Sequence, residues 1–406
     1  MPFRLLHTAD LLLDVPFIGV GPTPRPLFER LRDAPVATVD HLVGAALAHH
    51  VDAVLIAGGV SGGGPVSLRA ATRLTRGVCQ LADAGIPTVV VLGPREARAG
   101  LPASPGRDLP DAVTVVPPGE VVAVALERDG ERVVAVVAAS APYGPDQVAR
   151  AAGAVEGRPV VALATLPSGP PPPLDVEAGV AFWALGGAPE PRGGPVSGGG
   201  WAVVAAAPQP RVFPRPGPRP GAALLELGDG GPLPPTPLDI ADLRLVSAEV
   251  DLARALTIGE LEEQALAQLG PDDGRPVVAQ LVVHGDGPGR QALGDPAARR
   301  WVLDRLQSNM GARAPGWWSD LVLVPLPAAR RGALAQRSPG VAAVGARASE
   351  ALRAGPGAVL DAARQRVGAT DGGDGLPPPA AWAGIVHEAA SLALDLVGAA
   401  HDGGAR

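Results

Sequence analysis

Lysine is absent from this chain, so all 34 of its basic residues are arginines. A P-loop needs a lysine on the nucleotide phosphates, and Schiff-base chemistry needs a lysine amine, so both classes are excluded. The 41 acidic residues give a formal net charge of −7, which argues against a surface that coats DNA, since such domains are usually basic. A local basic patch at Arg211, Arg215 and Arg219 is an alternative, but we expect that proline-rich segment to be a solvated loop.

Cysteine and aromatic residues are also scarce. The single cysteine, Cys79, permits neither an intramolecular disulfide nor a multi-cysteine zinc site. Aromatic side chains make up only 3% of the residues, so Val, Leu and Ala must form the core. No apolar run approaches the roughly 20 residues that span a bilayer, and no signal-peptide pattern opens the sequence. We therefore expect a cytoplasmic protein with no membrane partner.

Alternating strand and helix patterns fill the first 100 residues. Helix patterns at 36–50 and 68–84 separate the apolar runs, with Pro35 suited to the first turn of one helix and Ser67 suited to cap the other. Because continuous apolar strands joined by helices are buried on both sides, they predict a parallel sheet covered on both faces. The predicted strands are residues 3–8, 53–57 and 86–92.

Strand patterns dominate after residue 110 and complete a first predicted domain, residues 1–237. Proline- and glycine-rich stretches at 167–173, 186–200 and 208–221 are interpreted as loops, and 228–237 as a linker. The predicted strands of this region are residues 112–116, 120–127, 132–139, 159–165, 180–185 and 222–227.

A smaller α+β domain is predicted over residues 238–345, followed by a helical C-terminal tail over 346–406. Thr257 and Glu260 have the spacing of a capping box, and Asp295 is suited to cap a second helix. The predicted elements of the smaller domain are strands at 243–252, 277–284 and 321–326 and helices at 257–269 and 295–307.

Four segments in which a strand runs into a turn carry a family resemblance: His7–Phe17, Val51–Gly59, Gly85–Glu96 and Ala184–Pro189. Their order and spacing resemble the calcineurin-like metallophosphoesterases, in particular the SbcD-type DNA-repair exonuclease subunits and their YhaO-like relatives. His7–Phe17, for example, is similar to the family's H-x-A-D-L-H-L-D-x-P-F. The resemblance covers roughly residues 1–330. It implies an α/β fold, a sheet sandwich flanked by helices and followed by a smaller α+β capping domain.

Members of that family use two divalent metal ions to clamp an in-line attack on a phosphodiester. Carried over residue by residue, the resemblance implies that Asp10 is the only retained metal ligand. Leu12 stands at a histidine slot, and Gly59 replaces the aspartate that bridges both ions. At the remaining family positions, Pro94 stands in place of an asparagine and Arg95 in place of the catalytic histidine. Thr165, Gly187 and Pro189 stand in place of later histidines. Since one carboxylate cannot hold two divalent ions, we expect no cofactor.

Nearby polar side chains offer little to rebuild such a site. His7 is interpreted as a structural hydrogen-bonding residue, and Asp14 as an organiser of its loop. Asp52 precedes its strand, at the wrong end for the site, whereas Glu96 keeps an acid at the last slot. Arg95 is a candidate phosphate contact, because a guanidinium can hold a phosphate without cleaving it; the alternative is a solvated arginine in a turn.

Three functions remain open at this point. The first, which we favour, is an inactive structural or regulatory subunit in DNA repair or recombination, whose partner would be an SbcC-like or SMC-like ATPase. The second is an active Mn²⁺- or Mg²⁺-dependent exonuclease or phosphodiesterase with an atypical ligand set. The third is a non-catalytic module that binds nucleic acid or phosphate. DNA and a second copy of the chain are further candidate partners.

Overall fold

In the computed structural model the chain forms two compact units, Met1–Leu245 and Val246–Arg406. The structure describes residues 1–324 with gaps, together with residues 343, 346–347 and 350. The gaps are residues 22, 63–65, 94–95, 97–107, 142–146, 148–149, 152–154, 156–158, 167–179, 189–190, 197, 214–220, 256, 286–288 and 312–315.

The first unit contains a mixed sheet in the order β12-β11-β1-β2-β3-β4, with β13 also paired to β11. Neighbouring strands from β1 to β4 are parallel, as predicted, but β11 runs antiparallel to β1. The parallel sheet predicted for residues 3–8, 53–57 and 86–92 is therefore confirmed, and the antiparallel strand β11 makes the whole sheet mixed. The strands are β1 (Phe3–Ala9), β2 (Ala53–Ala57), β3 (Thr88–Val91), β4 (Val113–Val116), β11 (Ala222–Gly228), β12 (Gly231–Pro232) and β13 (Thr236–Leu238).

The predicted linker at 228–237 is wrong, because β12 and most of β13 lie in this stretch and both pair antiparallel with β11. Its glycine and proline residues favour a linker on composition. The chain instead turns back once after β11 and pairs with it in two successive short segments, so the backbone hydrogen bonds of β11 decide the structure.

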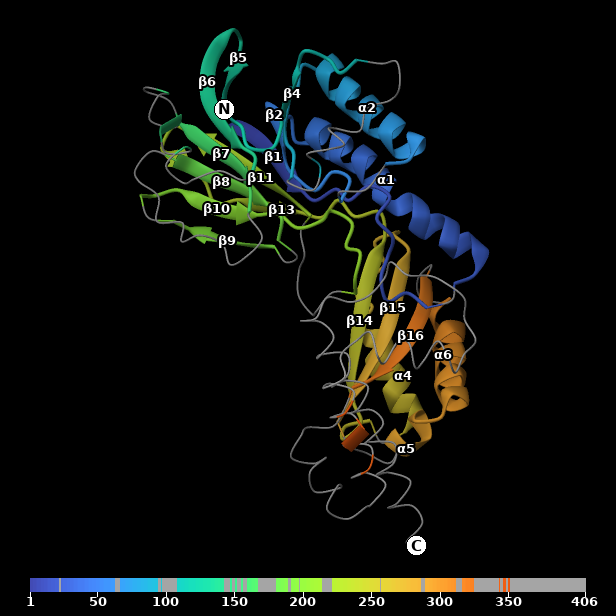
Figure 1. Cartoon of the computed structure of the whole chain (residues 1–406). Coiled ribbons are helices and arrows are strands. Elements are labelled where there is room, and N and C mark those ends of the chain that lie inside the picture. Colours follow the sequence, from blue (N-terminus) through green and yellow to red (C-terminus); the bar gives the residue numbers. More distant parts are fainter. Residues whose placement is uncertain are drawn as a thin grey trace, which may run out of the picture. The chain divides into compact units, whose positions relative to one another are not determined.

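Two helices, α1 (Arg25–Ala48) and α2 (Leu68–Asp83), cover one face of this sheet (Figure 1). Their apolar residues pack with strand residues that alternate toward this face, so a core forms between the two layers. Ser67 caps α2 as predicted, since its Oγ accepts a hydrogen bond from Ala70 N at 3.1 Å.

Helix α1 begins earlier than the predicted helix at 36–50. Pro35 lies inside α1 rather than in its first turn, and the turn before it is helical because Leu31 and Ala34 are buried with the rest of the apolar face. Burial of these residues thus outweighs the hydrogen bond that an internal proline removes.

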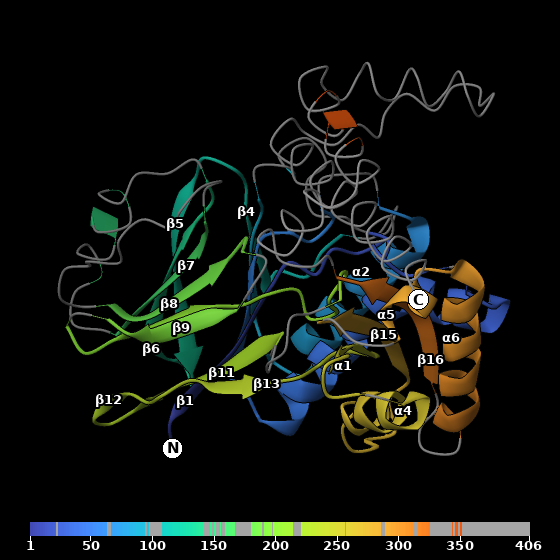
Figure 2. The same cartoon turned by 90° about the horizontal axis from the view of Figure 1, so that it is seen from below.

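The second sheet of this unit has the order β5-β6-β7-β8-β10-β9 and packs face to face against the first (Figure 2). It is also mixed, because β5 and β9 run antiparallel to their neighbours while β6, β7, β8 and β10 are parallel. The strands are β5 (Val121–Arg128), β6 (Glu131–Ala139), β7 (Val160–Thr165), β8 (Val180–Gly186), β9 (Arg192–Pro195) and β10 (Trp201–Val204).

One correction follows from this sheet. The stretch 186–200 is not all loop, because β9 lies within it as an edge strand. The first sheet is covered on both faces as predicted, by helices on one face and by the second sheet on the other. Leu5 and Leu55 on the other face share a core with Val161 and Leu163 of the second sheet. The first unit is thus a mixed α/β structure of two mixed sheets and helices.

The second unit contains a sheet in the order β14-β15-β16, in which β15 and β16 are parallel. Both predicted caps are confirmed: Thr257 and Glu260 form a capping box, and Asp295 Oδ1 accepts a hydrogen bond from Ala297 N at 2.9 Å. The predicted strand at 321–326 begins earlier, at Gly316. The elements are β14 (Arg244–Asp251), α4 (Ile258–Ala267), β15 (Val277–His284), α5 (Arg290–Leu293), α6 (Pro296–Met310) and β16 (Gly316–Leu323).

Within the described ranges, no helix combines the length and the apolar character that crossing a bilayer requires. The helices predicted after residue 350 lie outside those ranges.

Candidate functional site

The turns that follow β1, β2 and β3 meet the ends of β7 and β8 at one place in the first unit. Parallel strands end at the same edge of a sheet, so β1 to β3 bring their turns together there. Backbone contacts between the two sheets are close, since a Cβ on Gly186 would lie 1.9 Å from the carbonyl oxygen of Ala57. We call this place the strand-end edge; it comprises residues 10–12, 58–61, 93, 96, 165 and 186–187.

Asp10, which the resemblance matches to a family metal ligand, is bound to backbone groups at this edge. Its amide N–H donates to Gly58 O at 2.9 Å, and its Oδ2 accepts a hydrogen bond from Gly187 N at 2.9 Å. The residue adopts a left-handed conformation with φ of 51°, which aspartate tolerates better than most residues. The carboxylate therefore joins the end of β1 to the end of β8.

Gly59, at the slot of the bridging aspartate, has no room for a side chain. A Cβ there would lie 2.0 Å from Asp10 Oδ1 and 2.6 Å from Asp10 Cα. Gly59 also has a φ of 64°, a left-handed conformation that favours glycine. The backbone of the strand-end edge is therefore incompatible with an aspartate at position 59.

Glu96 retains an acid at the last family slot, but both of its oxygens bind backbone amides. Oε1 accepts a hydrogen bond from Ser61 N at 2.6 Å, and Oε2 accepts one from Gly93 N at 2.9 Å. The side chain is buried, with 1% of the residue exposed. Glu96 thus joins the turn after β2 to the turn after β3.

The loop after β1 continues alongside the turn after β2. Leu12 N donates to Gly59 O at 2.7 Å and Leu13 N donates to Val60 O at 2.9 Å. Leu12, at a lost histidine slot, has a left-handed φ of 51°. Thr165, at another lost slot, is buried and its Oγ1 accepts a hydrogen bond from Ala141 N at 3.2 Å. These two residues therefore support backbone structure at the strand-end edge.

Arg211 is neither solvated nor part of a basic surface patch, so both interpretations of this residue are wrong. Its guanidinium is buried and donates to the carbonyl oxygens of Leu11 at 2.9 Å, Leu12 at 3.0 Å and Gln209. It also lies over the ring of Phe17, 5.5 Å from the centroid. Burial lowers the pKa of the guanidinium to about 9, so it stays charged at neutral pH.

The other polar candidates have structural roles. The prediction for His7 is confirmed, because its Nε2–H donates to Leu185 O at 3.1 Å, and burial lowers its pKa to about 4 and keeps it neutral. The sequence predicts that Asp14 organises its own loop, but its Oδ2 accepts a hydrogen bond from Ser67 N at 2.6 Å, at the start of α2. Asp52 Oδ2 accepts one from Arg4 N at 2.7 Å, at the opposite end of β2. Pro94, Arg95, Pro189, Arg215 and Arg219 lie outside the described residues.

The described residues of the strand-end edge do not fit a two-metal centre. In the part of the chain that the structure describes, no three His, Cys, Asp or Glu side chains gather closely enough to hold a metal ion. Divalent ions such as Mn²⁺ and Mg²⁺ need several oxygen or imidazole ligands. The amides of Ser61, Gly93 and Gly187 would suit an anion, but each already donates to a carboxylate of the chain itself.

Comparison with known proteins gives one partial similarity. No protein-family model matches the chain. Over 95 residues it is 36% identical to the protein named uncharacterized metallophosphoesterase YhaO of Bacillus subtilis (strain 168). The aligned part is 23% of this chain, and it spans 23% of the relative's length. The similarity is distant and partial, and it relates the chain to the metallophosphoesterases only at the level of the superfamily.

Gln209 and the role of Arg211 were missed at the sequence level. Arg211 binds backbone carbonyls about 200 positions away, and Gln209 binds residues more than 30 positions away. Both residues lie in a proline-rich stretch whose composition indicates a loop. No local pattern marks a side chain whose partners are distant backbone groups.

Proposed function

We propose that this chain is a metallophosphoesterase-like protein without a catalytic metal centre, and that it acts as a structural or regulatory subunit. The observation that carries the proposal is the contact of Gly59 with Asp10. In a two-metal phosphoesterase the residue at position 59 bridges both ions, whereas here a Cβ at this position would meet an oxygen of Asp10 at 2.0 Å.

The hydrogen bonds of the remaining acids support the same conclusion. Metal ligation uses the lone pairs of carboxylate oxygens. Asp10 Oδ2 and both oxygens of Glu96 direct lone pairs at backbone amides instead. An incoming ion would have to displace these bonds and leave buried amides unpaired, which costs about 1–3 kcal/mol for each group. The strand-end edge therefore supports the fold rather than hydrolysis.

The resemblance to SbcD-type subunits is what supports the rest of the proposal. It favours an SbcC-like or SMC-like ATPase as partner and DNA repair or recombination as the process. In such a complex the inactive chain would contribute architecture or control, and DNA would be a second partner. The proposed partnership is tested by co-expression with an SbcC-like or SMC-like ATPase, followed by size-exclusion chromatography. Separate elution would refute the partner and leave the inactivity proposal standing.

Metal content and turnover test the inactivity directly. The full chain is purified with Mn²⁺ or Mg²⁺ present, bound metal is measured by mass spectrometry, and hydrolysis of a phosphodiester reporter and of linear DNA is followed. We expect substoichiometric metal and no turnover. Stoichiometric metal with turnover that disappears in Asp10→Ala would overturn the proposal. Asp14→Ala is the matched control, because Asp14 also accepts a backbone hydrogen bond but stands at no ligand slot.

A DNA-binding measurement at two salt concentrations separates a non-catalytic binding module from a purely architectural subunit. Salt-sensitive DNA binding without cleavage would favour the binding module, because binding through phosphate contacts weakens as salt rises. Absence of binding to free DNA is the result expected for a subunit that acts through its partner.

A further inference from the structure

Gln209 and Arg211, two positions apart in one buried stretch, bind two different parts of the first unit. Arg211 holds the loop of the strand-end edge, and Gln209 holds the segment that leads into β14. We propose that residues 209–211 form a latch that couples the strand-end edge to residues 240–243, which we call the exit segment. The inference rests on hydrogen-bond geometry and goes beyond the proposed function.

The first half of the latch is the guanidinium of Arg211. Its Nη2 donates to the carbonyl oxygens of Leu11 and Leu12, and its Nη1 donates to Gln209 O within the latch itself. The backbone carbonyl of Arg211 accepts a further hydrogen bond from Ile18 N at 2.8 Å. Side chain and main chain of one residue therefore hold the loop after β1 at two points.

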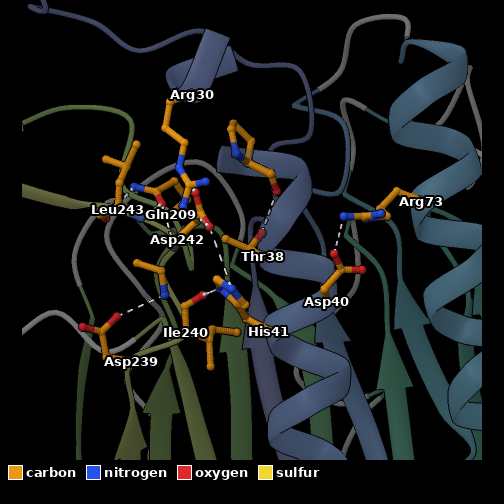
Figure 3. A network of polar contacts seen from close by, with 12 residues as sticks. Arg30, Thr38, Asp40, His41, Arg73, Gln209, Asp239, Ile240, Asp242 and Leu243 are labelled. Atoms are coloured by element: carbon orange, nitrogen blue, oxygen red, sulfur yellow. Dashed lines mark hydrogen bonds and ion pairs between the residues drawn. The ribbon is translucent and has the colours of Figure 1, made fainter. Parts of the chain in front are cut away.

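The second half is the carboxamide of Gln209, which is fully buried (Figure 3). Its Oε1 accepts hydrogen bonds from Asp242 N at 3.0 Å and Leu243 N at 3.1 Å. Its Nε2 donates to Leu243 O at 3.2 Å. One side chain thus satisfies three backbone groups of two neighbouring residues in the exit segment.

Helix α1 binds the exit segment through other side chains (Figure 3). The buried carboxylate of Asp242 pairs with Arg30, whose Nε lies 3.1 Å from Oδ2 and whose Nη2 lies 3.2 Å from Oδ1. His41 Nδ1 lies 3.2 Å from Ile240 O. The exit segment is therefore fixed to the first unit up to Leu243, and β14 begins at the next residue.

The strand-end edge and the exit segment are coupled because the side chains of Arg211 and Gln209 are both buried. A shift of the loop at 11–12 would leave a buried guanidinium without its acceptors unless the backbone of 209–211 moved with it. That movement would take the Gln209 carboxamide away from the exit segment, where three backbone groups would lose their partner. A partner that displaces the strand-end edge would thereby weaken the hydrogen bonds of the exit segment. Displacement of the exit segment would likewise weaken the hydrogen bonds that hold the loop at residues 11–12.

Amide hydrogen exchange of the full chain tests this reciprocity. The reporters are the amides of Asp10, Leu12 and Leu13 at one end and those of Asp242 and Leu243 at the other. Arg211→Met should accelerate exchange at both ends, and Gln209→Leu should do the same. We expect accelerations of about 5- to 150-fold at the distant end, the range of ordinary coupling free energies. Arg32→Met, at an exposed arginine, is the matched control and should leave both ends unchanged.

Amides of β7 and β15 serve as references that report global unfolding. Acceleration confined to residues 10–13 in Arg211→Met and to residues 242–243 in Gln209→Leu would overturn the latch. If Arg211→Met does not fold, Arg211→Lys replaces it, because lysine keeps the charge but lacks the guanidinium fork. Acceleration at the near end alone in that variant would equally refute the coupling.

Discussion

Asp10 Oδ2 and the backbone nitrogen of Gly187 are 2.9 Å apart, and their hydrogen bond joins a strand end of one sheet to a strand end of the other. Asp10, the residue that the resemblance matches to a metal ligand, thus has a structural contact within the chain. It connects turns that come from different strands. The following predictions test how far the strand-end edge depends on such contacts.

Asp10→Asn should keep the stability of the chain almost unchanged, whereas Asp10→Ala should lower it. Asparagine retains an oxygen that can accept from Gly187 N, and it tolerates the left-handed backbone of position 10. Alanine loses the bond and leaves an amide unpaired, for a loss of about 1–3 kcal/mol. Urea unfolding measures both variants. If Asn destabilises as much as Ala, the negative charge rather than the hydrogen bond matters.

Gly59→Asp, which restores the family's bridging residue, should destabilise the chain and should not bring metal binding back. The new Cβ meets Asp10, and the φ of 64° adds strain of about 1–2 kcal/mol for a non-glycine residue. Overpacking against backbone contributes about 1–3 kcal/mol more. Thermal unfolding and metal analysis provide the measurements.

Gly130→Asp is the matched control for that variant. Gly130 also has a left-handed φ, of 79°, but a Cβ there meets nothing within 4 Å. It should show the backbone strain alone. A Gly59→Asp protein as stable as Gly130→Asp, with bound Mn²⁺, would contradict the steric explanation.

Glu96→Gln should lower the free energy of unfolding by about 1–3 kcal/mol. The amide nitrogen of glutamine would face a backbone N–H where a carboxylate oxygen now accepts from Ser61 or Gly93. Glu29→Gln is the control, because Glu29 pairs with Arg25 on an exposed helix surface, where such pairs contribute little. Equal effects of the two substitutions in urea unfolding would count against a buried role for Glu96.

His7 should make the stability of the chain depend on pH between about 4 and 6.5. Burial lowers its pKa from 6.5 to about 4 in the folded chain, so the unfolded chain binds more protons in this interval. Stability therefore falls as the pH falls through it, by about 3 kcal/mol at full protonation, and this contribution is complete above pH 6.5. Unfolding of wild type and His7→Gln from pH 4 to 7 measures the difference.

His50→Asn is the control for the pH experiment, because His50 is exposed and asparagine accepts its left-handed backbone. The control should retain the pH dependence of the wild type. Identical curves for wild type and His7→Gln would show that another group is responsible.

The first strands and the helix caps could be predicted because they depend on neighbouring residues. The apolar run of β2, the cap at Ser67 and the capping box of Thr257 with Glu260 are all local patterns. The start of α1 could not be predicted, since no local pattern marks the burial of Leu31. The same holds for β12 and β13, whose partner β11 is what makes them strands.

The candidate site was predictable in position but not in mechanism. The resemblance placed family positions at Asp10 and Gly59 and predicted a loss of ligands, and both stay predictions. The close approach of these two residues could not be predicted, because a glycine in a sequence does not show which atoms occupy the space of its absent Cβ. Nor could the burial of Arg211, whose acceptors are backbone carbonyls.

The closeness of Gly59 to Asp10 also bears on how this edge could be redesigned. A carboxylate at position 59 would require the loop at residue 10 to withdraw first, because Asp10 occupies the volume that a Cβ needs. That loop is held by the guanidinium of Arg211 through the carbonyl oxygens of Leu11 and Leu12. A metal site engineered at this edge would therefore have to begin with the loop and not with the ligand.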